Sequence, residues 1–261
     1  MIQKNILSLI LESRRKKVQM LKGGRLGLEA MIKKAPAPLD FKKALRRPGK
    51  ISLIGEIKQA SPSGGILRQD FDPARIAGIY ERAQVAAISV LTEEEFFLGK
   101  LHYIEKVKQQ VKLPVLRKDF IIDEIQILES RAAGADAVLL ILRILDELKF
   151  RKLYAKARDL GMDVLVEAHS EKELRLALKC KAEIVGINNR NLSTLKVDID
   201  RTSRLVPFMP DDVVKVSESG VTSVKDMLVL KGLGVDAALV GASIMKAPDM
   251  EAKVRELNID V

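Results

Sequence analysis

Charged and amide side chains stand at the ends of short apolar runs in this chain. Glu56 and Lys58 end the first of these runs, and Lys118 ends the third. If the runs are strands of a parallel barrel, their carboxyl ends open into one mouth, where residues far apart in sequence meet. Lysines and carboxylates gathered in this way supply the groups that general acid and base catalysis needs. The candidates are Glu56, Lys58, Lys118, Glu167, Asn188, Glu218 and Ser219.

The same charges also have a structural interpretation. Glu56 and Lys58 lie two residues apart, so on a strand both side chains project from one face. Inward-facing lysines and carboxylates can form a buried ion-pair network, but desolvating several charges costs more than an apolar filling would. The catalytic interpretation is therefore favoured. In a mouth of low dielectric constant we expect lowered pKa values for Lys58 and Lys118, which would make both lysines usable general acids near neutral pH.

Glycine-containing turns at the last two runs predict an anion site. Ser217-Glu218-Ser219-Gly220 ends the seventh run, and Gly241-Ala242-Ser243 ends the eighth. These are the two loops in which barrels often hold a phosphate on backbone N–H groups at the start of a short helix. The polar, glycine-hinged loop Ser61-Pro62-Ser63-Gly64-Gly65 follows the first run and is either a flap over a substrate or an ordinary surface turn.

Other side chains near these positions have less specific interpretations. Phe97 and Phe120 would place aromatic faces beside the charged groups, for substrate stacking or for core packing. His169 follows Glu167 by two residues and is expected to support the site from a loop rather than to act as its base. Cys180 is the single cysteine, and with two histidines it forms no ligand pattern for a metal. The chain has neither a Walker loop nor a dinucleotide fingerprint, so no nucleotide cofactor is expected.

Eight short apolar runs must position these residues. Each has the length of a strand, and stretches with helical spacing such as 124–133 lie between them. Strands that alternate with helices about eight times predict an α/β fold, a (β/α)8 TIM barrel. The runs span 52–58, 87–92, 114–118, 137–141, 163–167, 184–188, 213–218 and 237–241.

Net charge distinguishes a basic N-terminal segment from the barrel. Residues 1–50 carry fourteen Lys and Arg and three acidic residues, or +11, whereas the other 211 residues carry 31 basic and 32 acidic groups, or −1. We therefore predict a basic helical extension over 1–48 packed on a barrel over 49–261, together one structural domain. No apolar stretch reaches the roughly 18 residues of a membrane span, and no signal segment begins the chain, so a cytoplasmic protein is expected.

Helical spacing within the extension predicts an amphipathic helix. Its apolar positions begin at Ile2 and Ile6, they flank the basic run Arg14-Arg15-Lys16-Lys17, and Gly23-Gly24 should end the helix. A second short helix is expected near Phe41. The basic run is either a solvated helix face, the preferred interpretation, or an RNA-binding patch.

At these residues the chain resembles a known family. The motifs Glu56–Ser63, Leu116–Phe120, Leu165–Glu167, Gly186–Leu192 and Ser217–Val221, taken in this order, are similar to those of indole-3-glycerol phosphate synthase of tryptophan biosynthesis. The resemblance runs from about residue 40 to Met245, and the basic segment resembles the N-terminal extension of that family. It implies the conversion of 1-(2-carboxyphenylamino)-1-deoxyribulose 5-phosphate to indole-3-glycerol phosphate, carbon dioxide and water, without a cofactor.

Position by position, the resemblance also implies roles. Lys118 matches the general acid of the family, and Lys58 matches a second catalytic lysine that meets the substrate carboxylate. Glu167 is the candidate base for dehydration, with a lysine as the acid. The remaining matches are polar partners of the reaction at Glu56, Asn188 and Ser219, substrate contacts at Ser61, Phe97, Phe120, Arg190 and Glu218, and phosphate contacts at Gly220, Gly241 and Ala242.

Two positions depart from a common form of this pattern. Ala60 stands where some members have a phosphate-binding lysine, and Ala242 stands where a serine or threonine often contacts phosphate. The resemblance therefore implies that the phosphate is held mainly by backbone amides here.

Two other functions remain as alternatives. Phosphoribosylanthranilate isomerase is another phosphate-binding barrel, but it is usually assigned a cysteine and aspartate pair, and Cys180 falls in a predicted helix rather than at a strand end. A nucleic-acid-binding protein would use the basic segment, which lacks interleaved aromatic residues. The expected partner is a phosphorylated small molecule, with no nucleic acid and no membrane, and the expected state is a monomer or weak homo-oligomer.

Overall fold

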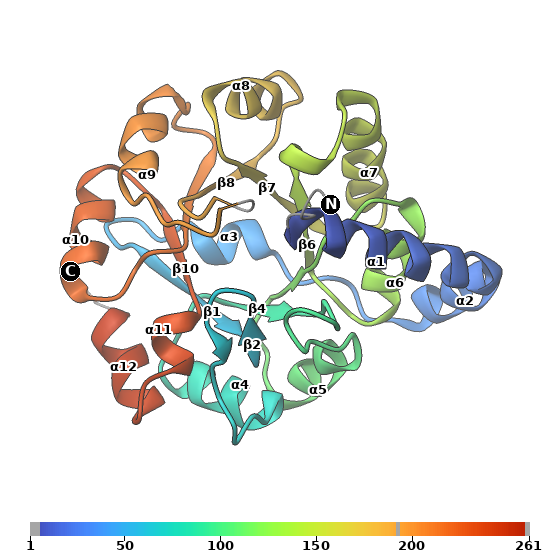
Figure 1. Cartoon of the computed structure of the whole chain (residues 1–261), viewed down its shortest axis with the longest axis horizontal. Coiled ribbons are helices and arrows are strands. Elements are labelled where there is room, and N and C mark those ends of the chain that lie inside the picture. Colours follow the sequence, from blue (N-terminus) through green and yellow to red (C-terminus); the bar gives the residue numbers. More distant parts are fainter. Residues whose placement is uncertain (1–5, 192–193, 259–261) are drawn as a thin grey trace, which may run out of the picture.

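Parallel strands close into a barrel at the centre of the molecule (Figure 1). The computed structural model describes residues 6–191 and 194–258, so Ile2 and Leu192 of the sequence analysis lie outside the described residues. The strands follow one another around the barrel in the order β1-β10-β9-β8-β7-β6-β5-β4. The predicted (β/α)8 barrel is confirmed. Its strands are β1 (Ser52–Ile57), β4 (Ala87–Leu91), β5 (Val115–Lys118), β6 (Ala137–Ile141), β7 (Asp163–Ala168), β8 (Ile184–Asn188), β9 (Val214–Glu218) and β10 (Ala237–Val240).

Helices surround the barrel, and several begin at a residue that caps them. The side chains of Asp72, Asp123, Asp146 and Ser170 each accept a hydrogen bond from a backbone N–H in the first turn of the helix that follows. The helices are α4 (Pro73–Arg82), α5 (His102–Gln110), α6 (Glu124–Ala132), α7 (Glu147–Asp159), α8 (Glu171–Lys179), α9 (Asp200–Leu205), α10 (Val224–Gly232), α11 (Ala242–Met245) and α12 (Met250–Leu257). A small hairpin of β2 (Ala60–Ser61) and β3 (Gly65–Ile66) forms the loop after β1.

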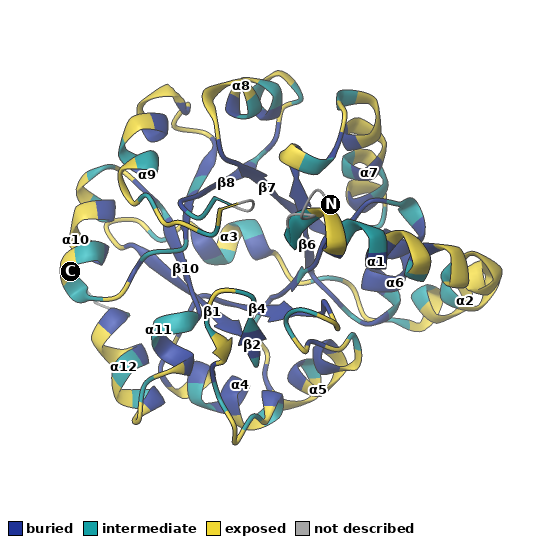
Figure 2. Ribbon diagram, in the orientation of Figure 1, coloured by how far each residue is buried: buried dark blue, intermediate teal, exposed yellow. Residues whose placement is uncertain are grey.

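The N-terminal segment contacts both ends of the barrel. Helix α1 (Ile6–Leu21) lies at the mouth formed by the carboxyl ends of the strands, where Ile6, Leu7 and Ile10 line a cavity. Helix α3 (Phe41–Leu45) closes the opposite end, because Phe41 and Leu45 are buried among the side chains of the barrel interior. Strand residues and inward helix faces are accordingly buried in Figure 2.

One helix of this segment was missed in the sequence. Helix α1 ends at Leu21 and a 3-10 turn covers Lys22–Gly24, close to the predicted stop, but α2 (Arg25–Lys34) follows at once. It packs against α6 through the half-buried Leu28 and Ile32. Its sequence follows Gly23-Gly24 and contains Gly27, and glycine disfavours a helix, so its helical state depends on this packing.

Candidate active site

A cavity of about 530 Å3 opens at the carboxyl ends of the barrel strands. It contains every residue that the sequence predicted for the site, brought together from seven strands and the loops that follow them. The predicted residues that line it are Glu56, Lys58, Ser61, Phe97, Lys118, Phe120, Glu167, Asn188, Arg190, Glu218, Ser219, Gly220, Gly241 and Ala242.

Glu56 and Lys58 form an ion pair at the end of β1. Glu56 is buried, whereas Lys58 keeps some exposure toward the cavity. Burial alone would raise the pKa of Glu56, but the ammonium groups of Lys58 and Lys118 hold it below its ordinary value. This glutamate is therefore a fixed negative charge between two lysines.

Lys118 lies between two buried carboxyl groups. Its Nζ is 3.5 Å from Oε2 of Glu218 and 3.8 Å from Oε2 of Glu167. Burial alone would lower the pKa of Lys118, but these two carboxyl groups and Glu56 raise it well above its ordinary value. The predicted lowering of the pKa is wrong for Lys118. The prediction considered desolvation in a cavity of low dielectric constant but not the carboxyl groups that face Lys118.

Glu218 is a carboxyl group of the cavity with a raised pKa. Burial and the adjacent carboxyl group of Glu167 raise the pKa of Glu218 to about 8, against the opposing effect of Lys118. Burial and the Glu167 carboxyl group therefore favour the protonated form of Glu218. The oxygens of Glu167 and Glu218 are buried, and their ion pairs with Lys118 and, for Glu167, the contact with His169 hold them in place.

His169 supports the site from behind rather than lining it. It is buried, with Nε2 3.3 Å from Oε1 of Glu167 and Nδ1 3.5 Å from Oε2 of Glu173. The structure thus places His169 between a cavity carboxylate and helix α8, in agreement with its predicted position outside the reacting groups.

Polar side chains at the end of β8 and in the loop that follows connect two loops across the cavity. Oδ1 of Asn188 accepts a hydrogen bond of 2.9 Å from the backbone N–H of Arg190. The guanidinium of Arg190 donates to the Leu195 carbonyl at 2.9 Å and to Ser63 Oγ at 3.2 Å, so it reaches the loop after β1. Ser61 Oγ accepts from the backbone N–H of Gly64 and shapes the same loop.

The two glycine turns meet at the side of the cavity between β9 and β10. Ser219 has a φ of 68° and Gly220 a φ of 95°. Positive φ favours glycine, which position 220 has. Gly241 has a different constraint, because a Cβ there would lie 2.1 Å from Oε2 of Glu56. The glycine at 241 therefore lets Glu56 approach the backbone, and a substitution there would disturb the charged centre as well as any anion.

The opposite side of the cavity is apolar. The rings of Phe97 and Phe120 are 6.2 Å apart between centroids. Ile6, Leu7 and Ile10 of α1 complete this side. The sequence predicted the two aromatic residues and an amphipathic helix packed on one end of the barrel, which the apolar spacing of Ile6 and Ile10 indicated.

Comparison with known proteins agrees with this arrangement. The family model of indole-3-glycerol phosphate synthase matches residues 7–257. The chain belongs to the indole-3-glycerol phosphate synthase family. Curated relatives of that name include those of Acetivibrio thermocellus, 48% identical over 92% of this chain and 95% of the relative, and Caldanaerobacter subterraneus, 53% identical over 83% of each. The relative from Desulforamulus reducens is 44% identical over 97% of this chain and 96% of its own length.

Solved structures support the fold alone. A 3-hexulose-6-phosphate synthase from Salmonella typhimurium aligns with a TM-score of 0.66 over 80% of this chain and 97% of its own, at 18% identity. A thiamine phosphate pyrophosphorylase from Pyrococcus furiosus aligns with a TM-score of 0.60 over 84% of this chain and 96% of its own, at 16% identity.

Three further features of the chain were considered in the sequence: its cysteine, its potential metal ligands and its apolar segments. Cys180 caps the end of α8 and does not line the cavity. Among residues 6–191 and 194–258, no cluster of three potential metal ligands occurs. Over the same part of the chain, every helix is too short or too polar to cross a membrane.

The basic run on α1 differs from the preferred expectation. Arg14 is 1% exposed and pairs with Glu93 and Asp119, so it is not part of a solvated helix face. The sequence missed this because the three residues lie far apart in the chain and only the docked helix brings them together. Arg15 and Lys16 are exposed as expected.

Proposed function

We propose that this cavity converts 1-(2-carboxyphenylamino)-1-deoxyribulose 5-phosphate to indole-3-glycerol phosphate with loss of carbon dioxide and water. The observation that carries the proposal is the position of Lys118, a partly buried cation that faces the open cavity with a carboxyl group on either side. The apolar wall of the cavity suits an aromatic ring, and its glycine turns suit a phosphate.

In the ring closure that we propose, Lys118 acts on the substrate carbonyl. Negative charge develops on the carbonyl oxygen as the electron-rich ring attacks it, and a fixed ammonium group stabilises that charge. The raised pKa of Lys118 keeps the cation in place, and an alkoxide is basic enough to take a proton even from such a lysine. Lys58 would hold the substrate carboxylate until it leaves as carbon dioxide, and Glu56 would keep that lysine in position.

Dehydration needs an acid and a base. We assign the base to Glu167, which lines the cavity 3.8 Å from Nζ of Lys118. The sequence suggested a lysine as the acid. The raised pKa of Glu218 makes its carboxylic acid a second candidate for the same proton transfer.

The remaining groups would orient the substrate. Backbone amides near Gly220, Gly241 and Ala242 would hold the phosphate, since Ala242 offers no side-chain donor. Asn188 and Arg190 would hold the loop after β1 over the substrate, through the hydrogen bond from Arg190 to Ser63. Ser219, Ser61, Phe97 and Phe120 would surround the hydroxyl groups and the ring.

Direct turnover tests this proposal. Purified protein is incubated with the carboxyphenylamino-deoxyribulose phosphate, and indole fluorescence and carbon dioxide release are followed. Stoichiometric appearance of both products supports the proposal. Conversion of phosphoribosylanthranilate in the absence of that activity would contradict it and favour the isomerase.

We further propose a cytoplasmic protein that is a monomer or weak homo-oligomer and does not bind nucleic acid. The positive charge of the N-terminal segment is partly neutralised within the chain, since Arg14 pairs with Glu93 and Lys17 pairs with Glu94. Sedimentation tests the oligomeric state. Titration with fluorescent RNA at low and high salt tests the last point, because nucleic-acid binding would appear at low salt and fall steeply with added salt.

A further inference from the structure

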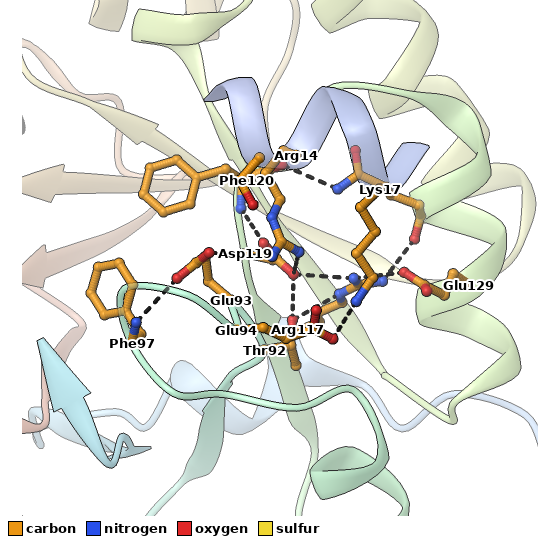
Figure 3. A network of polar contacts seen from close by, with 12 residues as sticks. Arg14, Lys17, Thr92, Glu93, Glu94, Phe97, Arg117, Asp119, Phe120 and Glu129 are labelled. Atoms are coloured by element: carbon orange, nitrogen blue, oxygen red, sulfur yellow. Dashed lines mark hydrogen bonds and ion pairs between the residues drawn. The ribbon is translucent and has the colours of Figure 1, made fainter. Parts of the chain in front are cut away.

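A cluster of buried charges lies behind the aromatic wall of the cavity (Figure 3). It contains two guanidinium groups and three carboxylates, all at most 5% exposed. Burial of so many charges costs free energy that an apolar filling would not, so the cluster calls for a role beyond stability. We call this set the buried charge cluster, and its members are Arg14, Glu93, Arg117, Asp119 and Glu129.

Arg14 is the one member that comes from the N-terminal segment. Its Nη2 donates to Oε1 of Glu93 at 3.2 Å, and its Nη1 donates to Oδ2 of Asp119 at 3.5 Å. The planar guanidinium thus spans the loop after β4 and the end of β5, a geometry that a single ammonium group cannot reproduce. Lys17, one turn along α1, adds an outer contact to Glu94 at 2.5 Å.

Glu93 also binds the backbone of the aromatic wall. Its Oε2 accepts hydrogen bonds from the backbone N–H groups of Phe96, at 2.7 Å, and Phe97, at 3.1 Å. The orientation of the Glu93 carboxylate therefore fixes the backbone from which the Phe97 ring enters the cavity.

Asp119 does the same for the second ring. Its Oδ1 accepts from the backbone N–H of Phe120 at 2.8 Å, and it follows Lys118 directly in the chain. Burial alone would raise the pKa of Asp119, but the guanidinium groups of Arg117 and Arg14 hold it below its ordinary value, so this acceptor remains charged. Oδ2 of Asp119 is anchored independently by Thr92 at 2.6 Å.

We propose that Arg14 is a positioning residue, which acts through Glu93 to hold Phe97 beside Phe120 at the spacing that receives the aromatic ring of the substrate. The proposal rests on the function proposed above. It assigns to α1 a task in substrate recognition, in addition to covering the cavity with Ile6, Leu7 and Ile10.

The geometry separates this task from the chemical step. Lys118 is held by Glu167 and Glu218, neither of which contacts Arg14. Loss of Arg14 should therefore disturb ring binding, which is expressed in KM, while the proton transfers and hence kcat change little. A residue with a purely structural role would change the fraction of folded protein but neither constant of the protein that remains folded.

The test compares Arg14→Met with the double variant Arg14→Met/Glu93→Gln. The single change should lower the melting temperature, because it leaves a buried carboxylate unpaired, and should raise KM about tenfold with kcat within about threefold of wild type. The double change removes that unpaired charge and should recover much of the melting temperature while KM stays high. All constants are measured well below the melting transition, with the folded fraction checked by circular dichroism.

Arg25→Met and Arg25→Met/Glu29→Gln form the matched control, since that ion pair is exposed on the outer helix α2 and should affect neither constant. An unchanged KM in folded Arg14→Met, or a KM that recovers together with the melting temperature in the double variant, would overturn the proposal. A wild-type protein without turnover would instead contradict the proposed function, so the two failures are distinguishable.

Discussion

Lys118 differs from an ordinary partly buried lysine because its neighbours are carboxyl groups. Desolvation alone would lower the pKa of Lys118, whereas Glu218 and Glu167 raise it and favour the charged form. The sequence predicted which charged residues face the mouth, because side chains of a barrel strand alternate between inside and outside. The balance between desolvation and charge was not readable, since it depends on distances of 3.5 and 3.8 Å between residues from three different strands.

Replacement of Lys118 should therefore affect chemistry more than folding. Lys118→Met should lower kcat by about 10² to 10⁴, the usual range for a positioned proton donor, with a KM close to wild type. Lys106→Met, at an exposed lysine of α5, is the control and should retain full activity. A folded Lys118→Met with turnover close to wild type would exclude Lys118 as the acid.

Glu218 predicts a pH dependence of stability. Its pKa is about 8 in the fold against an ordinary 4.5, so between these values the native state holds a proton that the unfolded chain releases. The stabilisation is complete below pH 4.5 and is lost as the pH rises toward 8, at up to about 1.4 kcal/mol per pH unit. A glutamine never ionises, so Glu218→Gln should gain stability relative to wild type from pH 5 to pH 8.

Urea unfolding at pH 5, 6, 7 and 8 measures this difference. Glu171→Gln, at an exposed carboxyl group of α8, should show no such trend. A difference between Glu218→Gln and wild type that is constant over this range would mean that Glu218 titrates normally in the fold.

At the scale of elements, the strands were predictable and part of the N-terminal segment was not. Apolar runs fixed the barrel strands to within about one residue at each end, because strands buried on both sides must be continuously apolar. The position of Gly241 in its loop was also predictable, but its reason was not. The sequence suggested the approach of an anion, whereas the structure adds the close approach of Glu56 from a neighbouring strand.

For this reason the phosphate proposal is better tested at Ala242, the first residue of α11, than at Gly241. A negative charge in a first helical turn does not disfavour the helix, but it repels a phosphate bound there. Ala242→Glu should raise KM by about tenfold or more, whereas Ala242→Ser should leave it unchanged or lower it.

Ala252→Glu places the same change in the first turn of α12, outside the cavity, and is the matched control. If the KM of Ala242→Glu equals that of this control, the phosphate lies elsewhere.

At the scale of the whole molecule, the N-terminal segment joins the two ends of the barrel. Helix α1 covers the mouth, α2 packs on α6, and α3 closes the base, where the backbone N–H of Lys42 donates to Asp163 at the start of β7. Composition alone distinguished a basic segment from a neutral barrel. It did not reveal which of those charges are buried partners of the barrel, as Arg14 is, and which face solvent near the mouth, as Arg15 and Lys16 do.

The solvent-facing charges predict a dependence of substrate capture on salt. Arg15 and Lys16 lie five and six residues beyond Ile10, or about 8 to 9 Å along the helix, which is comparable with the Debye length of roughly 8 to 10 Å in ordinary buffers. An anionic substrate should therefore be drawn toward the mouth at low ionic strength. Deleting the whole segment would also remove Arg14, so neutralising the two exposed residues is the cleaner change.

Arg15→Gln/Lys16→Gln should lower kcat/KM about two- to threefold at low salt, leave kcat unchanged, and converge with wild type at high salt, where the charges are screened. Lys33→Gln/Lys34→Gln removes the same charge from the end of α2, which lies at the outer edge of the molecule in Figure 1, and should keep the salt dependence of wild type. kcat/KM is measured over a series of potassium chloride concentrations. Equal slopes for wild type and both double variants would eliminate steering by α1 and leave Arg15 and Lys16 as a solvated helix face.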